Sequence, residues 1–174
     1  MTAQIVLILF IFLMLTAAVS DLRFYRLPNW LVAAVASLFI IAAVVTGMPV
    51  NLALWHGLAG TLILLVGFGL FSANIVGGGD AKLLAAVALW IGWTKLATFI
   101  VYTALAGGAL AIVMVIWEFF RMHVELTAGN PNSSLIKRIT SLKPDLPYGV
   151  AIAAGACATL PETWWAASWS LINN

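Results

Sequence analysis

Charged residues are scarce in this chain of 174 residues, where they make up only 8% of the sequence, whereas hydrophobic residues make up 64%. A soluble domain cannot cover a core of that size with so few charges. Because lipid offers no hydrogen-bond partner to unpaired backbone groups, the composition predicts an all-α integral membrane protein built from apolar helices. The apolar runs are continuous, and this excludes a transmembrane barrel, whose strands alternate apolar and polar residues.

Cysteine is almost absent as well. The single cysteine, Cys157, lies in an apolar run, which excludes an internal disulfide and a zinc site built from several cysteines. The two histidines, His56 and His123, fall on opposite sides of the membrane in the topology predicted below, so they cannot share a metal ion. We expect no metal site, no cofactor and no nucleic-acid partner.

Long apolar runs take up most of the chain, and a helix needs about 20 such residues to cross about 30 Å of hydrocarbon. With breaks at Gly47, at Gly92–Lys95 and at Pro161, the runs predict about six spans. Their ranges are 3–20, 30–45, 52–72, 81–92, 96–118 and 147–160. The fourth is only about 18 Å long. Its start is therefore expected to lie in a recess covered by neighbouring helices.

The whole chain, residues 1–174, is interpreted as a single membrane domain. One long polar segment, residues 121–146, predicts a loop between the fifth and sixth helices. The tail, residues 163–174, is rich in tryptophan. It is expected to lie at the membrane interface or to continue the last span.

Basic residues are distributed unequally between the two sides of this topology. One side carries only Lys95, and the other carries Arg23, Arg26, Lys82, Arg121, Lys137, Arg138 and Lys143. The positive-inside rule places the second group, with loop 121–146, in the cytoplasm and both termini in the periplasm. Tryptophans agree: Trp30 and Trp117 mark one interface, and Trp55, Trp90, Trp93, Trp164 and Trp165 mark the other.

Three consecutive glycines, Gly77, Gly78 and Gly79, precede Asp80 between two apolar runs. Glycine tolerates positive φ and close approach by another backbone, so this stretch predicts a sharp non-helical turn ahead of Asp80. The same turn would let an extended substrate strand approach Asp80. A phosphate-binding loop is disfavoured because no Gly-Lys-Ser/Thr follows and Asp80 would repel an anion.

Asp21 ends the first predicted span and Asp80 begins the fourth, so both lie at the cytoplasmic face. Two close carboxylates cannot both ionise cheaply, so one keeps its proton while the other takes a proton from water that attacks a peptide carbonyl. Taken singly, Asp80 can cap the helix it begins, and Asp21 can pair with Arg23. Asp145, before the sixth span, is a third carboxylate and is better explained as a helix cap.

Three sequence motifs carry a family resemblance. They are Asp21 followed after five residues by Leu27-Pro28-Asn29, the segment Gly77-Gly78-Gly79-Asp80-Ala81-Lys82-Leu83-Leu84, and Leu146-Pro147-Tyr148-Gly149. Together they resemble the type IV prepilin leader peptidase family, the GxGD-type membrane aspartic proteases, in its short TadV/CpaA-like form that serves Flp-type pili. The resemblance covers nearly the whole chain.

This resemblance implies that Asp21 and Asp80 are the catalytic residues. It implies a membrane aspartic endopeptidase of the bacterial inner membrane that removes the basic leader of type IV or Flp-type prepilins and pseudopilins at the cytoplasmic face. The implied cleavage follows a leader glycine. Longer members carry an extra cytoplasmic region with paired cysteines and also N-methylate the new terminus. This chain has a single cysteine, so no methyltransferase activity is expected.

Several neighbours of the dyad are candidate substrate-binding residues. They are Gly77, Gly78, Gly79, Pro28, Asn29 and Lys82. Pro28 and Asn29 also suit the first turn of a helix, with Asn29 as its cap. Lys82 can tune the dyad electrostatically or extend to the interface as a snorkelling lysine. Small residues such as Gly60, Gly149 and Gly155 are expected to let helices pack closely, with a few of them as alternative candidates for lining the groove that receives the substrate helix.

Two other classes of function remain open from the residues. A small transporter or channel can use intramembrane aspartates to carry protons or cations, and an assembly subunit needs no chemistry at all. Transport predicts discontinuous helices and an acidic residue near the bilayer middle. Both aspartates are placed at one face instead, which favours the peptidase.

Overall fold

The computed structural model describes residues 2–127 and 146–165. Within these residues all regular structure is helical, as predicted. The helices are α1 (Thr2–Phe24), α2 (Asn29–Val45), α3 (Val50–Ser72), α4 (Gly78–Ile91), α5 (Leu96–Thr127) and α7 (Tyr148–Thr159), and short 3₁₀ turns lie at Trp93–Lys95 and Leu160–Glu162.

In the part of the chain that the structure describes, three segments are long and apolar enough to cross a membrane, namely Gln4–Phe24, Val50–Ser72 and Trp93–Val124. Helix α2 is apolar but shorter, and α4 and α7 have only 14 and 12 residues. At about 1.5 Å per residue, α4 and α7 are shorter than a hydrocarbon core of about 30 Å. The chain is thus a helical membrane protein, and the count of six spans and the side of each terminus stay predictions.

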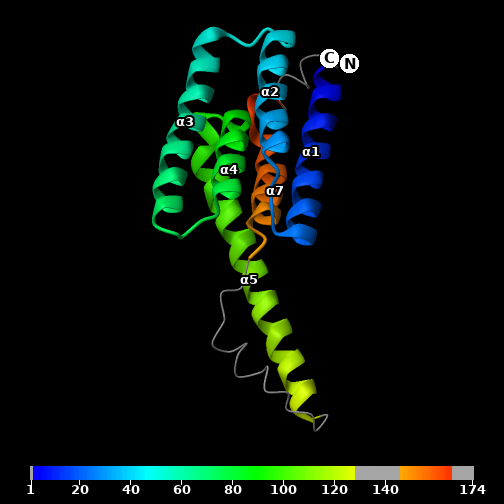
Figure 1. The fold of residues 1–174 in the computed structure, drawn as a ribbon. Helices are drawn as coiled ribbons and strands as arrows, with labels where there is room; N and C mark the ends of the chain where they lie inside the picture. The colour runs from blue at the N-terminus through cyan, green and yellow to red at the C-terminus, as the bar shows by residue number, and fades with distance from the viewer. Residues whose placement is uncertain (1, 128–145, 166–174) are drawn as a thin grey trace.

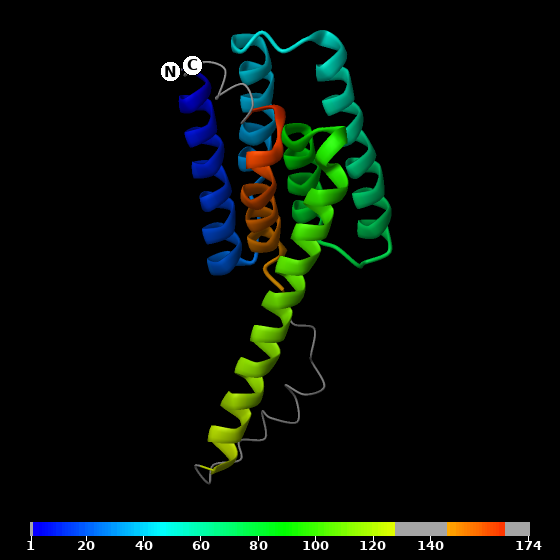
Figure 2. The ribbon, with the colours of Figure 1, turned by 180° about the vertical axis from the view of Figure 1, so that it is seen from behind.

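The two short helices, α4 and α7, lie in the middle of the bundle, and longer helices surround them (Figures 1 and 2). Helix α4 packs against α2, α3 and α7, whereas α7 packs against α1, α4 and α5. Helix α3 approaches α4 so closely that a Cβ added at Gly60 would lie 2.5 Å from Leu89, and one added at Gly67 would lie 3.0 Å from Ala81. Small residues of this kind allow close helix packing within lipid.

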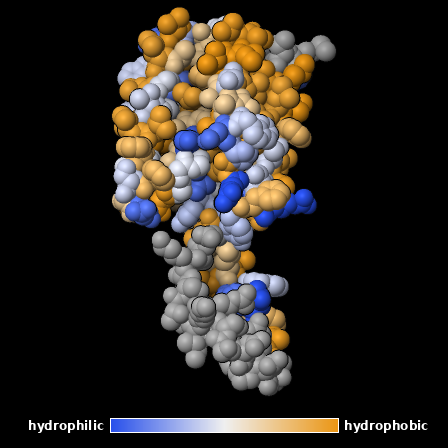
Figure 3. Space-filling model, viewed as in Figure 1, coloured by the Kyte–Doolittle hydropathy of each residue, from blue (hydrophilic) through white to orange (hydrophobic). Residues whose placement is uncertain are grey.

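Apolar side chains cover much of the outer surface, and hydrophilic residues gather toward the lower part of the bundle (Figure 3). Phe12, Leu65 and Phe68, for example, are each more than 60% exposed. Soluble proteins rarely expose such large contiguous apolar areas. This surface is therefore suited to contact with lipid.

Two of the tryptophans predicted at the interface lie in the core instead. Trp90 is fully buried and Trp165 is 2% exposed. Their indole N–H groups find partners inside the protein, since Trp90 Nε1 donates to Val35 O at 2.9 Å and Trp165 Nε1 donates to Trp90 O at 2.7 Å. With Phe10 and Phe39 they form an aromatic cluster at the end of α4 that follows Leu89. Satisfied N–H groups are what allow these large rings to be buried.

Helices α1 and α5 are longer than predicted. Helix α1 continues through Asp21 to Phe24, and α5 continues to Thr127 and extends well beyond the other helices (Figure 1). No glycine or proline interrupts the sequence between Trp117 and Thr127, so nothing there ends the helix. The first residues of the predicted loop 121–146 are therefore helical. Residues 128–145, which include Asp145, and tail residues 166–174 lie outside the described residues.

The predicted breaks at Gly47, Gly92 and Pro161 are confirmed. Gly47 and Gly92 adopt φ of +66° and +75°, the left-handed region that favours glycine. At Gly92 an added Cβ would lie 2.6 Å from His56, which is an additional reason for glycine there. Pro161 lies in the 3₁₀ turn that follows α7. The chain thus reverses after α4 and α7 ends where the sequence indicates.

Candidate active site

Asp21 lies in the last turn of α1 and is only 5% exposed. Its Oδ2 accepts a hydrogen bond of 2.6 Å from the backbone N–H of Gly149 in the first turn of α7. The first N–H groups of a helix have no partner within the helix and carry partial positive charge. The start of α7 therefore supplies both a hydrogen-bond donor and a favourable electrostatic field to a negatively charged Asp21. From the sequence, Arg23 was the possible partner of Asp21.

A side chain at position 149 would crowd Asp21. A Cβ added there would lie 2.8 Å from Asp21 Oδ2 and 3.0 Å from Asp21 Cβ. Pro147 precedes the helix as its N-cap residue, which suits a position where a backbone N–H is not needed. The sequence motif Leu146–Gly149 thus places the backbone N–H of Gly149 within hydrogen-bond distance of the Asp21 carboxylate. Gly149 was expected only to allow close helix packing or to line the substrate groove.

Asp80 lies in the first turn of α4, and Gly77 is the N-cap residue of that helix. The expectation that the three glycines form a non-helical turn is wrong, because α4 already begins at Gly78 and none of the three has positive φ. The chain turns earlier, at Asn74, whose φ is +58°. Asp80 therefore follows the N-cap residue inside the helix and is not itself the cap.

The glycines are needed for space. An added Cβ would lie 2.7 Å from Asp80 Oδ2 at Gly77, 3.2 Å from the Phe71 ring at Gly78, and 3.2 Å from Leu27 Cβ at Gly79. Contacts in the range 3.0–3.4 Å already force a neighbour to shift, and 2.7 Å is closer still. The glycine stretch thus lets Asp80, α3 and the α1–α2 connection converge on one point.

The two carboxylates interact electrostatically. Asp80 lies outside the three segments long enough to cross a membrane. Burial, and to a smaller extent the nearby charge of Asp21, together raise the pKa of Asp80 to about 7. A pair of acids with different environments, one held by a backbone donor and one favoured in its neutral form, is typical of an acid–base site.

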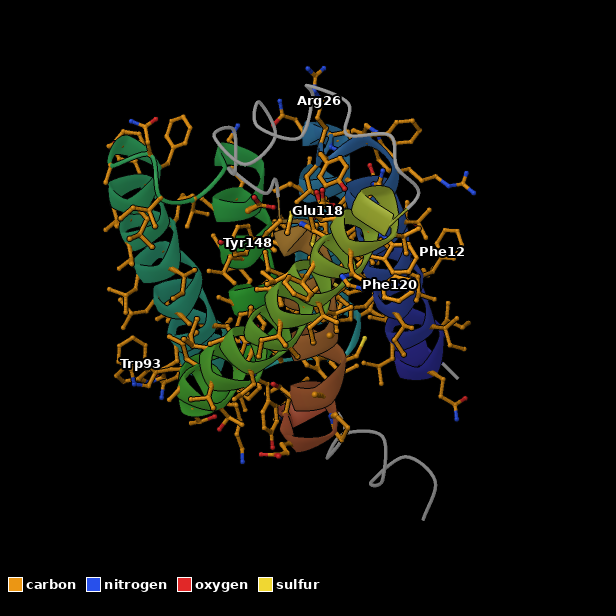
Figure 4. All side chains as sticks on the ribbon, turned by 90° about the horizontal axis from the view of Figure 1, so that it is seen from below. Phe12, Arg26, Trp93, Glu118, Phe120 and Tyr148 are labelled. Carbon is orange, nitrogen blue, oxygen red and sulfur yellow. The ribbon has the colours of Figure 1, made fainter. Side chains whose placement is uncertain are left out.

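Two cavities open beside the dyad. One has a volume of about 770 Å³ and lies along the α1–α2 connection. The other, of about 480 Å³, lies between the α3–α4 connection and the start of α7. Both are lined by Asp21 and Asp80. Figure 4 views the bundle from this end, with Tyr148 of the second cavity near the middle and Arg26 of the first at the edge.

Five of the six residues predicted to bind substrate line the larger cavity. They are Gly77, Gly78, Gly79, Pro28 and Asn29. Lys82 does not line it, and its Nζ donates to Asn29 Oδ1 at 3.1 Å. Asn29 is the first residue of α2, and Pro28, without a side-chain cap bond, is the N-cap. The predicted capping by Asn29 is therefore wrong, and its side chain joins α2 to α4.

Several residues that line the cavities were not predicted from the sequence to bind substrate or to catalyse the reaction. They are Ser20, Phe24, Tyr25, Arg26, Leu27 and Trp30 in the larger cavity, and Phe71, Asn74, Ile75, Val76, Leu146 and Tyr148 in the smaller one. Most of them lie within or next to the three motifs, and that proximity is the signal that could have found them. Among the described residues, no group of three His, Cys, Asp or Glu side chains could hold a metal ion.

Comparison with known proteins gives two kinds of match. A family model described as the type IV leader peptidase family matches residues 8–112. Two curated relatives, both named prepilin leader peptidase/N-methyltransferase, come from Burkholderia pseudomallei strains 1026b and K96243. Each is 35% identical to this chain over 85 residues, which are 49% of this chain and 21% of the relative. The match thus spans about one fifth of the length of these relatives. No solved structure matches the chain.

Proposed function

Because the chain belongs to the type IV leader peptidase family, we propose that it is an aspartic endopeptidase that removes the N-terminal leader of prepilins and pseudopilins. The observation that carries the proposal is that Asp21 and Asp80, from helices far apart in the sequence, line the same two cavities. Both fall within the residues that the family model matches.

The two carboxylates have different roles in this proposal. Asp21, which accepts the Gly149 N–H at the start of α7, is the ionised base. Asp80, whose pKa of about 7 favours the neutral form, is the acid. This division follows the general rule that paired titratable groups in unlike environments take opposite parts in proton transfer.

The reaction needs only water and these two groups. Asp21 takes a proton from water as the water oxygen attacks the scissile carbonyl carbon, and Asp80 gives its proton to the carbonyl oxygen. When the tetrahedral intermediate collapses, the C–N bond breaks. The leaving amine then takes the proton held by Asp21, and the intermediate returns a proton to Asp80. Both carboxyl groups regain their starting states.

The site is proposed to face the cytoplasm of a bacterium, in the inner membrane, with both termini in the periplasm. The support is the placement of basic residues. Arg23, Arg26 and Lys82 flank the dyad end of the bundle, whereas Lys95 lies at the far end of α4 in an ion pair with Glu162. Lys and Arg are enriched on the cytoplasmic side of membrane proteins. A basic leader would lie on that side in its precursor.

We propose the short Flp-type form, with cleavage and no methyl transfer. The relatives carry both activities in their name, but the match covers only 21% of their length. This chain has one cysteine, Cys157, in α7. The paired cysteines that the longer form carries in its extra region thus have no counterpart in this sequence.

Co-expression with a pilin precursor tests the function. Wild type is expected to shorten the precursor, whereas Asp21→Asn and Asp80→Asn each reduce cleavage by about 10²- to 10⁴-fold at unchanged membrane levels. Glu162→Gln is the matched control, since it also neutralises a carboxylate but at the opposite end of the bundle. Full processing of the precursor by either aspartate variant would contradict the dyad.

A further inference from the structure

The two cavities meet at four residues. Asp21, Tyr25, Gly77 and Asp80 line both of them, and we call this set the neck. The larger cavity continues from the neck along the α1–α2 connection, and the smaller continues toward Phe71 and Leu146. An extended peptide that occupies both cavities therefore has to pass the neck, which includes both carboxylates.

The neck has one large side chain besides the acids. Gly77 contributes none, so Tyr25 is the one large side chain without a carboxylate among the four neck residues. Its side chain is about half exposed, at 52%. The ring is thus available to a peptide in either cavity and is not committed to the core.

The backbone of Tyr25 is in an unfavourable conformation for a tyrosine. Its φ is +49°, and its N–H donates to Asp21 O at 2.9 Å, which ends α1 with a left-handed residue. Glycine or asparagine usually occupies such a position, because a Cβ is disfavoured there. Tyr25 and Asn74 are the two non-glycine residues with positive φ in the described chain, and both line these cavities. A tyrosine that is poorly suited to ending a helix points to a use for its ring.

We propose that Tyr25 is a specificity-determining residue, which limits the size of the substrate residue whose carbonyl is cleaved. The proposal rests on the proposed peptidase function. For a carbonyl held between Asp21 and Asp80, the side chain of the same substrate residue lies in the neck against the Tyr25 ring. A small side chain on that substrate residue fits beside the Tyr25 ring. A branched side chain has to displace either the ring or the scissile carbonyl. Displacing the carbonyl from the carboxylates slows the chemical step steeply.

The test uses three synthetic precursors that differ only at the cleaved residue, which is Gly, Ala or Val. Purified wild type is expected to prefer Gly over Val by about 10- to 100-fold in kcat/KM. Tyr25→Gly removes the ring and suits the positive φ, so the variant is expected to fold and to reduce that preference to about threefold or less. Tyr25→Phe keeps the ring and is expected to keep the wild-type preference.

Two controls separate the inference from the function on which it rests. Phe24→Ala removes an adjacent aromatic ring that lines the larger cavity outside the neck, so its preference should match wild type. Asp80→Asn should reduce cleavage of all three precursors by about 10²- to 10⁴-fold. An unchanged Gly-to-Val preference in Tyr25→Gly overturns the size limit while leaving the peptidase assignment in place. Loss of the preference in Tyr25→Phe, or loss of all cleavage in Tyr25→Gly, also overturns it. If wild type cleaves no precursor, the proposed function itself fails, and the size limit fails with it.

Discussion

The two ends of α4 have opposite surroundings. At its start, Gly77 and Asp80 border two cavities, and the first two residues of the helix are glycines. At its end, Trp90 is fully buried, with its ring 4.5 Å from Phe10 and 5.0 Å from Trp165 between ring centres. One helix of 14 residues thus joins a hollow end to a tightly packed end.

The two ends of α4 thus have separate roles: the Trp90 end stabilises the bundle, and the Asp80 end takes part in the proposed reaction. Close packing at the Trp90 end holds α4 against α1 and α2, and dense contacts of this kind resist displacement. The start of α4 then keeps its position although a peptide has to enter beside it. Catalytic groups have to stay within a fraction of an ångström of their productive geometry, so the rigid end supports the open end.

The largest effect is expected at the packed end. Trp90→Ala removes a buried ring and its hydrogen bond to Val35 O, which should cost about 3–5 kcal/mol of unfolding free energy. Thermal denaturation of the detergent-solubilised protein measures it. Trp117→Ala on α5, where the ring is 63% exposed, is the matched control and should change stability little. Equal losses in the two variants would contradict the difference between the ends of α4.

A different outcome is expected for Gly149→Ala at the open end. The added Cβ would lie 2.8 Å from Asp21 Oδ2, so either the carboxylate or the start of α7 has to move. A displacement near 1 Å at a catalytic group can cost about 100-fold in rate. We expect kcat to fall by about that factor with KM little changed, because the substrate binds elsewhere in the cavities.

The matched control for Gly149→Ala is Gly69→Ala. An added Cβ at Gly69, on α3, meets no atom within 4 Å, so the same chemical change has no packing consequence there. Alanine also favours a helix over glycine by about 1 kcal/mol. Cleavage by Gly69→Ala should match wild type. If Gly149→Ala also matched wild type, the start of α7 would have no part in positioning Asp21.

The pH profile distinguishes the two carboxylates. The pKa of Asp80 is raised to about 7, so its neutral form predominates below that pH and is lost as the pH rises through it. If neutral Asp80 protonates the scissile carbonyl, kcat/KM should fall about tenfold per pH unit above about 7. Rates of precursor cleavage between about pH 5 and 9 measure this. A profile that stays flat above pH 7 would exclude Asp80 as the acid.

Much of the fold was predictable because the sequence marks its own breaks. Gly47, Gly92 and Pro161 end apolar runs, and the structure turns or ends a helix at each. The end of α5 was not predictable in this way, since residues 117–127 contain neither glycine nor proline. The burial of Trp90 was missed because a tryptophan near a helix end suits either an interface or a core. Only the partner of its N–H decides between them.

The candidate site was predictable in part for a related reason. Motifs identify Asp21 and Asp80 and the residues beside them, because those residues are close in sequence. The bond from Gly149 to Asp21 joins residues 128 positions apart, and only the packing of α7 against α1 brings them together. The glycines were assigned flexibility because local sequence does not reveal that Phe71 and Leu27 would occupy the space of their side chains.

The smallest effect is expected at the bond from Lys82 Nζ to Asn29 Oδ1, which ties the first turn of α4 to the first residue of α2. Removing it with Lys82→Met or Asn29→Ala should lower kcat/KM by only about three- to tenfold, in line with about 0.5–1.5 kcal/mol for one exposed hydrogen bond. The double variant separates this positioning role from direct substrate binding by Lys82. If the pair acts only through its mutual bond, the double variant is no worse than either single one. If Lys82 binds substrate directly, Lys82→Met raises KM, Asn29→Ala leaves KM unchanged, and the two effects add.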